Sequence, residues 1–306
     1  MNAPDIIRSR YFGPAAVTMA VIWGLMGAAG VAEACPCGCG TASPEVMFPG
    51  ETWKYSLALS RQAQFKTVDT EGTLGSSNGP SAKDAFAMAI SRAVGLRASV
   101  TGTIPFQRNS HTGDQSTQTM GDPTLSARYT LYMPDFTNPL IPQVQLQGAY
   151  KRSISRSIRE SSDEHLMDVH GNGFNEIAAG GDVTWAMTDI KFSASALALY
   201  SQQKSFEDAT YQPGPGYRLS ATTGYSWIGT GQVLAIVEQE TLGKLKVDST
   251  VIDDSQKIAN NIALSGSLKV GMKRTAGLQL KRTAAFGRNK NTTRSDAGTM
   301  TYTVAL

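Results

Sequence analysis

The sequence predicts an all-β protein that folds as a transmembrane antiparallel up-and-down β-barrel of about twelve strands. Apolar and polar residues alternate with a period of two over most of the chain beyond residue 50, as in strands whose two faces meet different surroundings. Short and long connections interleave strictly between these stretches, as in a meander with tight turns at one end and polar loops at the other. Aromatic residues gather at both ends of the apolar rows, where two membrane interfaces would lie.

The first six strands are predicted from apolar rows that are separated mainly by Ser, Thr, Gln, Lys and Arg. These rows are Trp53, Tyr55, Leu57 and Leu59; Phe86, Met88 and Ile90; Leu96, Ala98, Val100, Ile104 and Phe106; Leu125, Ala127, Tyr129 and Leu131; Val144, Leu146 and Tyr150; and Ile177, Val183, Trp185 and Met187.

The last six strands follow the same pattern, except that the run from Gln232 to Val247 does not reveal which of its faces is apolar. The remaining rows are Ile190, Phe192, Ala194, Ala196 and Tyr200; Tyr217, Leu219, Ala221 and Tyr225; Ile258, Ile262, Leu264, Leu268, Val270 and Met272; Leu278, Leu280 and Phe286; and Met300, Tyr302, Val304 and Leu306. A soluble β-sandwich also has alternating strands, but its water-facing rows would normally carry more charge than these.

The ends of the strands carry further signals. Trp53, Trp185 and Trp227 lie beside short connections, and the opposite ends carry Phe106, Tyr200, Tyr217 and Phe286, which together predict two aromatic girdles. The chain finishes on an alternating apolar strand, which resembles the signal read by the outer-membrane assembly machinery. We therefore expect residues 51–306 to form the barrel, with both ends of it on the short-turn, periplasmic side and lipid around it.

Composition narrows the function classes. Charged residues make up 17% of the 306 residues, against roughly 25% in an average globular chain. The net charge of +3 is too small to indicate a nucleic-acid partner, and no nucleotide-binding loop is present in the sequence.

Residues 1–34 have the three regions of a secretory signal peptide. Arg8 and Arg10 precede an apolar stretch from Pro14 to Ala32, and an A-x-A cleavage pattern ends at Ala34. The alternative is an uncleaved anchor helix, because about 18 apolar residues can span a bilayer. We expect cleavage, export and a location in the outer membrane.

Residues 35–50 are expected to form a periplasmic segment that contains all three cysteines, Cys35, Cys37 and Cys39. Cysteines this close together cannot link distant parts of a fold, which excludes a disulfide framework. Soft thiolates at this spacing suit Cu(I) or zinc. Acylation of Cys35, or an oxidised tail without a function, are the alternatives.

The rows opposite the apolar ones are rich in bases, and they predict the lining of the lumen. These bases are Lys54, Arg97, Arg128, Lys151, Lys191, Arg218, Lys269 and Lys281. Acidic counterparts are fewer, namely Glu176 and Asp182, with Glu238 or Glu240 uncertain. Excess positive charge in a narrow tube favours anions. Alternatively, these bases pair with acids and fill the lumen as a plug.

Two local features leave questions open. Lys281 and Arg282 are adjacent, so strict alternation would point one of them to lipid unless a β-bulge turned Arg282 inward. The longest loop contains His165 and His170 with Asp163, Glu164 and Asp168, which form either a metal site or an ordinary solvated loop. Because all three histidines fall in loops, we expect no catalytic triad within the barrel, and no cofactor.

The chain resembles the MetA-pathway of phenol degradation family of outer-membrane barrel proteins. The resemblance rests on the Cys35–Gly40 cluster, on Ile104-Pro105-Phe106 at the end of the third strand, and on Gly121-Asp122 before the fourth. It implies an outer-membrane barrel with a transport role. We expect a porin-like passive channel for small solutes; a non-conducting scaffold or a metal-binding protein, and a barrel enzyme, are the alternatives.

Overall fold

The computed structural model describes residues 51–75, 80–111, 116–133, 141–163, 166–187, 189–206, 209–227, 230–284 and 287–306, without the side chains of residues 64 and 65. The described residues belong to one unit that spans Ala32–Leu306. None of them forms a helix that is long and apolar enough to cross a membrane. The predicted signal peptide, the three cysteines, Glu164, His165 and Phe286 lie outside the described residues.

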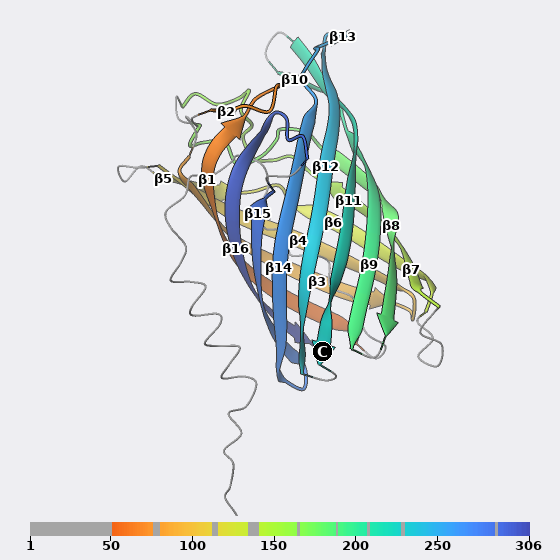
Figure 1. The fold of residues 1–306 in the computed structure, drawn as a ribbon. Coiled ribbons are helices and arrows are strands. Elements are labelled where there is room, and N and C mark those ends of the chain that lie inside the picture. Colours follow the sequence, from red (N-terminus) through yellow and green to blue (C-terminus); the bar gives the residue numbers. More distant parts are fainter. Residues whose placement is uncertain are drawn as a thin grey trace, which may run out of the picture. The chain divides into compact units, whose positions relative to one another are not determined.

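Twelve long strands form a closed antiparallel barrel, which confirms the predicted fold class (Figure 1). Each long strand pairs with the next along the chain, and β1 pairs with β16 to close the ring. The long strands are β1 (Trp53–Val68), β3 (Ala82–Val94), β4 (Ala98–Ser110), β6 (Thr124–Tyr132), β7 (Gln143–Lys151), β8 (Glu176–Met187), β9 (Ile190–Ser201), β11 (Ala209–Trp227), β12 (Gly231–Val247), β14 (Lys257–Gly271), β15 (Arg274–Thr283) and β16 (Thr292–Ala305).

The two ends of the barrel differ. Four short strands, β2 (Leu74–Gly75), β5 (Ser116–Met120), β10 (Lys204–Phe206) and β13 (Thr250–Val251), pair with β1, β4, β11 and β12 at the end that carries the long connections. We call this the long-loop end and the opposite one the short-turn end. Both ends of the barrel sequence meet at the short-turn end, where the Thr52 amide donates to the Leu306 carbonyl at 3.1 Å.

The outward rows are apolar and exposed, which is the reverse of a water-soluble protein. Leu59 is 59% exposed and Leu125 is 57% exposed, as lipid-facing side chains are. Facing inward are small and polar side chains, many of them joined across strands. Ser56 bonds Thr303 at 2.9 Å across the β1–β16 closure, and Gln145 donates to Thr130 at 3.0 Å. Satisfied polar groups of this kind belong in a barrel interior.

The aromatic residues lie where the strand ends place them. Trp53 begins β1, Trp185 lies close to the end of β8 and Trp227 ends β11, so all three are at the short-turn end. Phe106, Tyr200 and Tyr217 are exposed on the outward rows towards the other end.

Two details of the strands bear on the sequence prediction. No β-bulge turns Arg282 inward: the β14–β15 register runs unbroken from Asn261↔Thr283 to Lys269↔Thr275, so strict alternation holds and Arg282 stays outward. There its Nε donates to Asp296 Oδ1 at 2.6 Å, which balances its charge near the strand end. The third strand begins at Ala98 and not at Leu96, because residues 95–97 form the turn.

Candidate functional site: the lumen

One side of the lumen carries a network of ion pairs on inward rows. Glu240 of β12 lies between Arg218 of β11, at 2.6 Å, and Lys257 of β14, at 3.4 Å. Arg218 also donates from Nε to Glu240 Oε2 at 3.1 Å, so two of its nitrogens bind the same carboxylate. On the same inward row of β12, Glu238 accepts from Lys281 at 2.7 Å. Each of these half-buried charges has a partner, as a low-dielectric wall requires.

The network continues around the wall. Lys151 of β7 contacts Glu176 of β8 at 3.3 Å, and these two residues are directly opposite in the strand register. Asn261 donates to Glu238 at 3.0 Å. Both glutamates of β12 therefore face inward, which resolves the ambiguity that the sequence left for this strand.

A second group of charges is less completely paired. Arg128 of β6 and Lys191 of β9 both interact electrostatically with Asp182 of β8. The guanidinium reaches Gln147 Oε1 at 3.4 Å, yet Arg128 Nε and Asp182 Oδ1 are buried without a hydrogen-bond partner among the described residues. Unpartnered polar atoms in a lumen are open to bonds from water or from a passing solute.

The remaining predicted bases lie near the short-turn end. Lys54 pairs with Glu51 at 3.0 Å, and Lys269 is exposed on the inward row opposite Thr275. Arg97 lies in the turn before β4 and not in the wall, and its guanidinium reaches the Leu131 carbonyl at 3.5 Å.

Sequence reasoning missed two inward bases, Lys83 and Lys257. Both lie on the inward faces of their strands. They come before the first large apolar residue of the outward row, in a part of the strand where the alternation was not followed. Lys83 is only 2% exposed and is paired in register with Gln62 and Asn109. Extending the alternation by three residues before Phe86 and by one residue before Ile258 would have found them.

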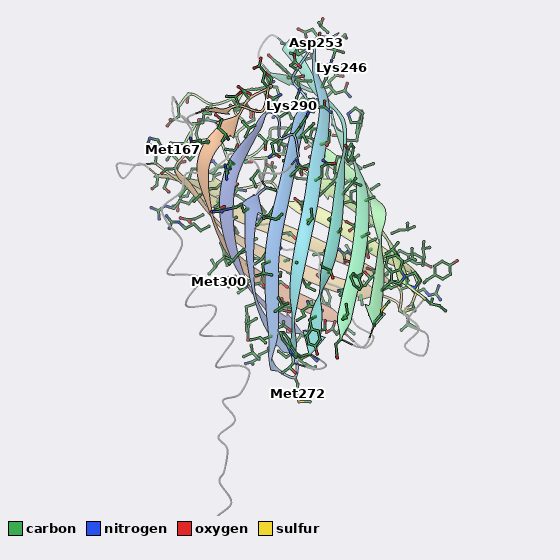
Figure 2. The ribbon with its side chains drawn as sticks, in the orientation of Figure 1. Met167, Lys246, Asp253, Met272, Lys290 and Met300 are labelled. Carbon is green, nitrogen blue, oxygen red and sulfur yellow. The ribbon has the colours of Figure 1, made fainter. Side chains whose placement is uncertain are left out.

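The connection between β7 and β8, residues 152–175 with 152–163 and 166–175 described, packs against the inward row of β4 at the long-loop end. Figure 2 labels Met167 of this connection. Asn109 Nδ2 donates to the carbonyl of Met167 at 2.9 Å and to that of Val169 at 2.7 Å. Thr117 of β5 also donates to the Met167 carbonyl. Met167 and Val169 are each 1% exposed, so this connection is a folded element rather than a solvated loop.

Further contacts fix the connection to the barrel. Asp122 Oδ1 accepts from the Ser155 amide at 3.1 Å and from the Ser155 hydroxyl at 2.6 Å. Lys204 of β10 forms an ion pair with Glu160 at 3.0 Å. The ring of Phe174 packs edge-on against that of Phe206, with the ring centroids 5.6 Å apart. The segment is therefore held from β5, from the start of β6 and from β10.

The cluster of histidines and acids for which the sequence left a metal site or a solvated loop open falls in this same segment, with Asp163, Asp168 and His170 among the described residues. Burial alone would raise the pKa of Asp168, but hydrogen bonds from Ser161 and Arg156 lower it below its ordinary value. The pKa of His170 is lowered, chiefly by burial, and its ring nitrogens face the carbonyls of Asp168 and Thr117. Within the described stretches, no group of three or more His, Cys, Asp or Glu side chains is arranged to hold a metal ion.

No known family profile matches the chain, and no curated protein does. Among solved structures, an outer membrane channel from Pseudomonas putida F1 superposes with a TM-score of 0.70 at 13% identity, over 88% of this chain and 100% of that channel. The NanC porin superposes with a TM-score of 0.50 at 9% identity, over 82% of this chain and 100% of the porin.

The chain has the fold of outer-membrane channels. At such low identities the likeness concerns the fold alone, so the function is argued from the residues of the lumen.

Proposed function

We propose that this protein is an outer-membrane channel through which small hydrophilic solutes cross passively, with a preference for anions. The observation that carries the proposal is the charge of the inward rows of a closed barrel. Inward bases outnumber inward acids in the described part of the wall. The bases are Lys54, Lys83, Arg128, Lys151, Lys191, Arg218, Lys257, Lys269 and Lys281, and the acids are Glu176, Asp182, Glu238 and Glu240.

The group formed by Arg128, Asp182 and Lys191 is the part of the wall that would set the preference. Two bases share one acid there, and Arg128 cannot lose its proton to relieve the imbalance. Fixed positive charge in a low-dielectric tube attracts anions and repels cations. The network of Arg218, Lys257 and Lys281 with Glu238 and Glu240 also has one more base than acids, but its charges are held in hydrogen-bonded ion pairs and are less available to a passing solute.

The same proposal includes the route to the membrane. Residues 1–34 would be removed as a signal peptide, and the C-terminal strand would be read by the assembly machinery. Membership of the MetA-pathway of phenol degradation family belongs to the proposal as well, supported by the short motifs of the sequence.

Planar-bilayer recording with the purified full chain tests the proposal. We expect stepwise conductance, and in a KCl gradient a reversal potential of the sign that anion selectivity gives. Replacing Arg128 and Lys191 by Gln should move the reversal potential towards the cation side. Arg61→Gln is the matched control, because Arg61 is a base on the outward face of β1. Raising the salt from 0.1 M to 1 M should weaken the preference, since the screening length falls from about 10 Å to 3 Å.

The alternative of a non-conducting scaffold has one observation in its favour, namely the packing of residues 152–175 against the inward row at the long-loop end. A barrel that inserts, folds and never conducts would support the scaffold. Cation selectivity, or an unchanged reversal potential in the double variant, would refute the anion preference while leaving the channel intact.

A further inference from the structure

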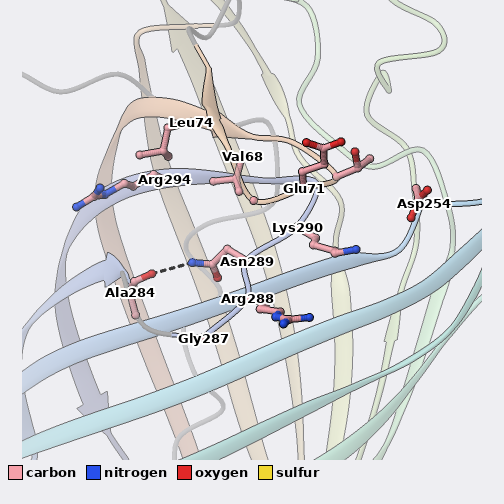
Figure 3. A pocket seen from close by; sticks show the side chains of 12 residues that line it. Val68, Glu71, Leu74, Asp254, Ala284, Gly287, Arg288, Asn289, Lys290 and Arg294 are labelled. Carbon is pink, nitrogen blue, oxygen red and sulfur yellow. Dashed lines mark hydrogen bonds between the residues drawn. The ribbon is translucent and has the colours of Figure 1, made fainter.

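A cavity of about 770 Å³ opens at the long-loop end, between the β1–β3, β12–β14 and β15–β16 connections (Figure 3). Its lining combines apolar side chains with three bases, Arg288, Lys290 and Arg294. The volume falls within the range of about 300–1,000 Å³ that small-molecule sites occupy.

The cavity lies on the same side of the sheet as the lipid-facing rows. Thr293 and Ser295 of β16 belong to the inward row, where Thr283 bonds both. Because side chains alternate along a strand, Arg294 points outward, and so does Val68, which pairs with Thr292. The cavity is therefore separate from the lumen and continues the outer surface of the barrel beyond the end of the apolar rows.

The floor of the cavity is apolar. Val68 lies on the outward row of β1 and is 6% exposed, and Ala284, the residue that follows β15, is 3% exposed. Leu74 of β2, which pairs with Val68, contributes a larger and more exposed apolar side chain.

The three bases of the lining are not held in ion pairs. Arg288, Lys290 and Arg294 form no ion pair within the described part of the chain, and their side chains make no hydrogen bond there. By contrast, the outward bases closer to the membrane are neutralised, Arg61 by Asp84 and Arg282 by Asp296. The acids of the lining, Glu71 and Asp254, are fewer than its bases.

We propose that this cavity binds the phosphate headgroup of an amphiphile from the surrounding membrane leaflet. Arginine presents paired N–H donors that match phosphate oxygens, and lysine adds a compact point charge. The apolar floor accommodates the first carbons of the amphiphile, which a free phosphate does not have. Glu71 and Asp254 accept hydrogen bonds from hydroxyl or amino groups beside the phosphate.

Native mass spectrometry of the detergent-folded full chain tests the proposal. The probes are a diacyl phosphatidic acid, the matching diacylglycerol without phosphate, and inorganic phosphate. We expect phosphatidic acid to bind at least about tenfold more tightly to the wild type than to the triple variant Arg288→Gln, Lys290→Gln, Arg294→Gln, since each base near a charged lipid surface contributes appreciably. The double variant Lys273→Gln, Arg274→Gln removes exposed bases at the short-turn end and should bind like the wild type.

Three results would overturn the proposal. Equal binding of diacylglycerol would show that the phosphate is not recognised. An equal loss in the short-turn control would show that the attraction is merely to net charge. Competition by inorganic phosphate as strong as that by phosphatidic acid would assign the site to a soluble phosphate. Heat-modifiable migration on gels verifies that each variant is folded before it is measured.

Discussion

The Glu240→Gln variant is the most direct test of the network of ion pairs on the inward rows. Glutamine keeps the shape of the side chain but removes the charge that Arg218 and Lys257 share. At the observed separations of 2.6 Å and 3.4 Å, an effective dielectric of about 20 gives Coulomb attractions of about 6 and 5 kcal/mol before desolvation. Desolvation offsets most of this attraction.

Breaking a fully buried pair by removing one partner costs about 3–5 kcal/mol. Because the Arg218 side chain is 37% exposed, we expect a smaller loss of about 2–3 kcal/mol in the free energy of unfolding. The loss is measured from urea or guanidinium unfolding of the refolded barrel in detergent, with tryptophan fluorescence as the probe. Asp84→Asn removes an exposed pair on the outward face, with its atoms 3.8 Å apart, and should cost about 0–1 kcal/mol.

A double-mutant cycle with Arg218→Gln separates the pair from general effects of substitution. We expect the two substitutions to be coupled by at least about 1 kcal/mol, because the double variant removes both charges of the Arg218–Glu240 pair and leaves neither of these two charges without the other. A Glu240→Gln variant as stable as the wild type, or additive substitutions, would contradict the view that these charges act as one structural unit.

Two further predictions concern the folded connection of residues 152–175. Asn109→Ala should remove the two hydrogen bonds to the Met167 and Val169 carbonyls, at about 0.5–1.5 kcal/mol each, and limited proteolysis should then cut this connection sooner than in the wild type. The matched comparison is Asn291→Ala, which removes two hydrogen bonds to the carbonyls of another connection, those of Asp254 and Gln256, and should not change cleavage within residues 152–175. Since burial lowers the pKa of His170, its neutral form stabilises the connection above the unfolded value of about 6.5, and that stability is lost as the pH falls below it. Amide exchange is base-catalysed and slows as the pH falls, so each rate is divided by the intrinsic rate at that pH. The protection obtained for residues 152–163 and 166–175 should then decrease between about pH 7.5 and pH 5, and an unchanged pH dependence in His170→Gln would argue against this cause.

The strands could be predicted from the sequence because lipid and lumen impose opposite preferences on alternate residues. The run Val233–Val237 is the exception, since it is apolar on both faces. Leu234 faces inward there, opposite Gly224 of β11, and a side chain in place of that glycine hydrogen would meet Leu234 Cδ2 at 2.6 Å. Large and small residues thus fill the interior together, a pairing between strands that no single run of sequence reveals.

The candidate site also has a part that the sequence could predict and a part that it could not. Side chains alternate between the two faces of a strand, so the inward bases Arg128, Lys191 and Arg218 could be predicted from each strand separately. Their partners were not, because ion pairs depend on the register between strands, such as Arg218 opposite Glu240. The packing of residues 152–175 was hidden for a similar reason: it rests on hydrogen bonds to Asn109, which is far away in the chain.

The depth of the membrane can be argued from β1 alone. The rise from Trp53 to Arg61 is about 26 Å along a strand, or about 20 Å of height at the usual tilt, close to the apolar band of about 25 Å. Arg61 and its partner Asp84 therefore lie at the upper boundary of the lipid, and Leu57 lies near its middle. Leu57→Arg should destabilise the folded barrel in lipid vesicles by about 2–4 kcal/mol, whereas Arg61→Leu should change its stability by no more than about 1 kcal/mol. If Leu57→Arg were as harmless as Arg61→Leu, this placement of the lipid would be wrong.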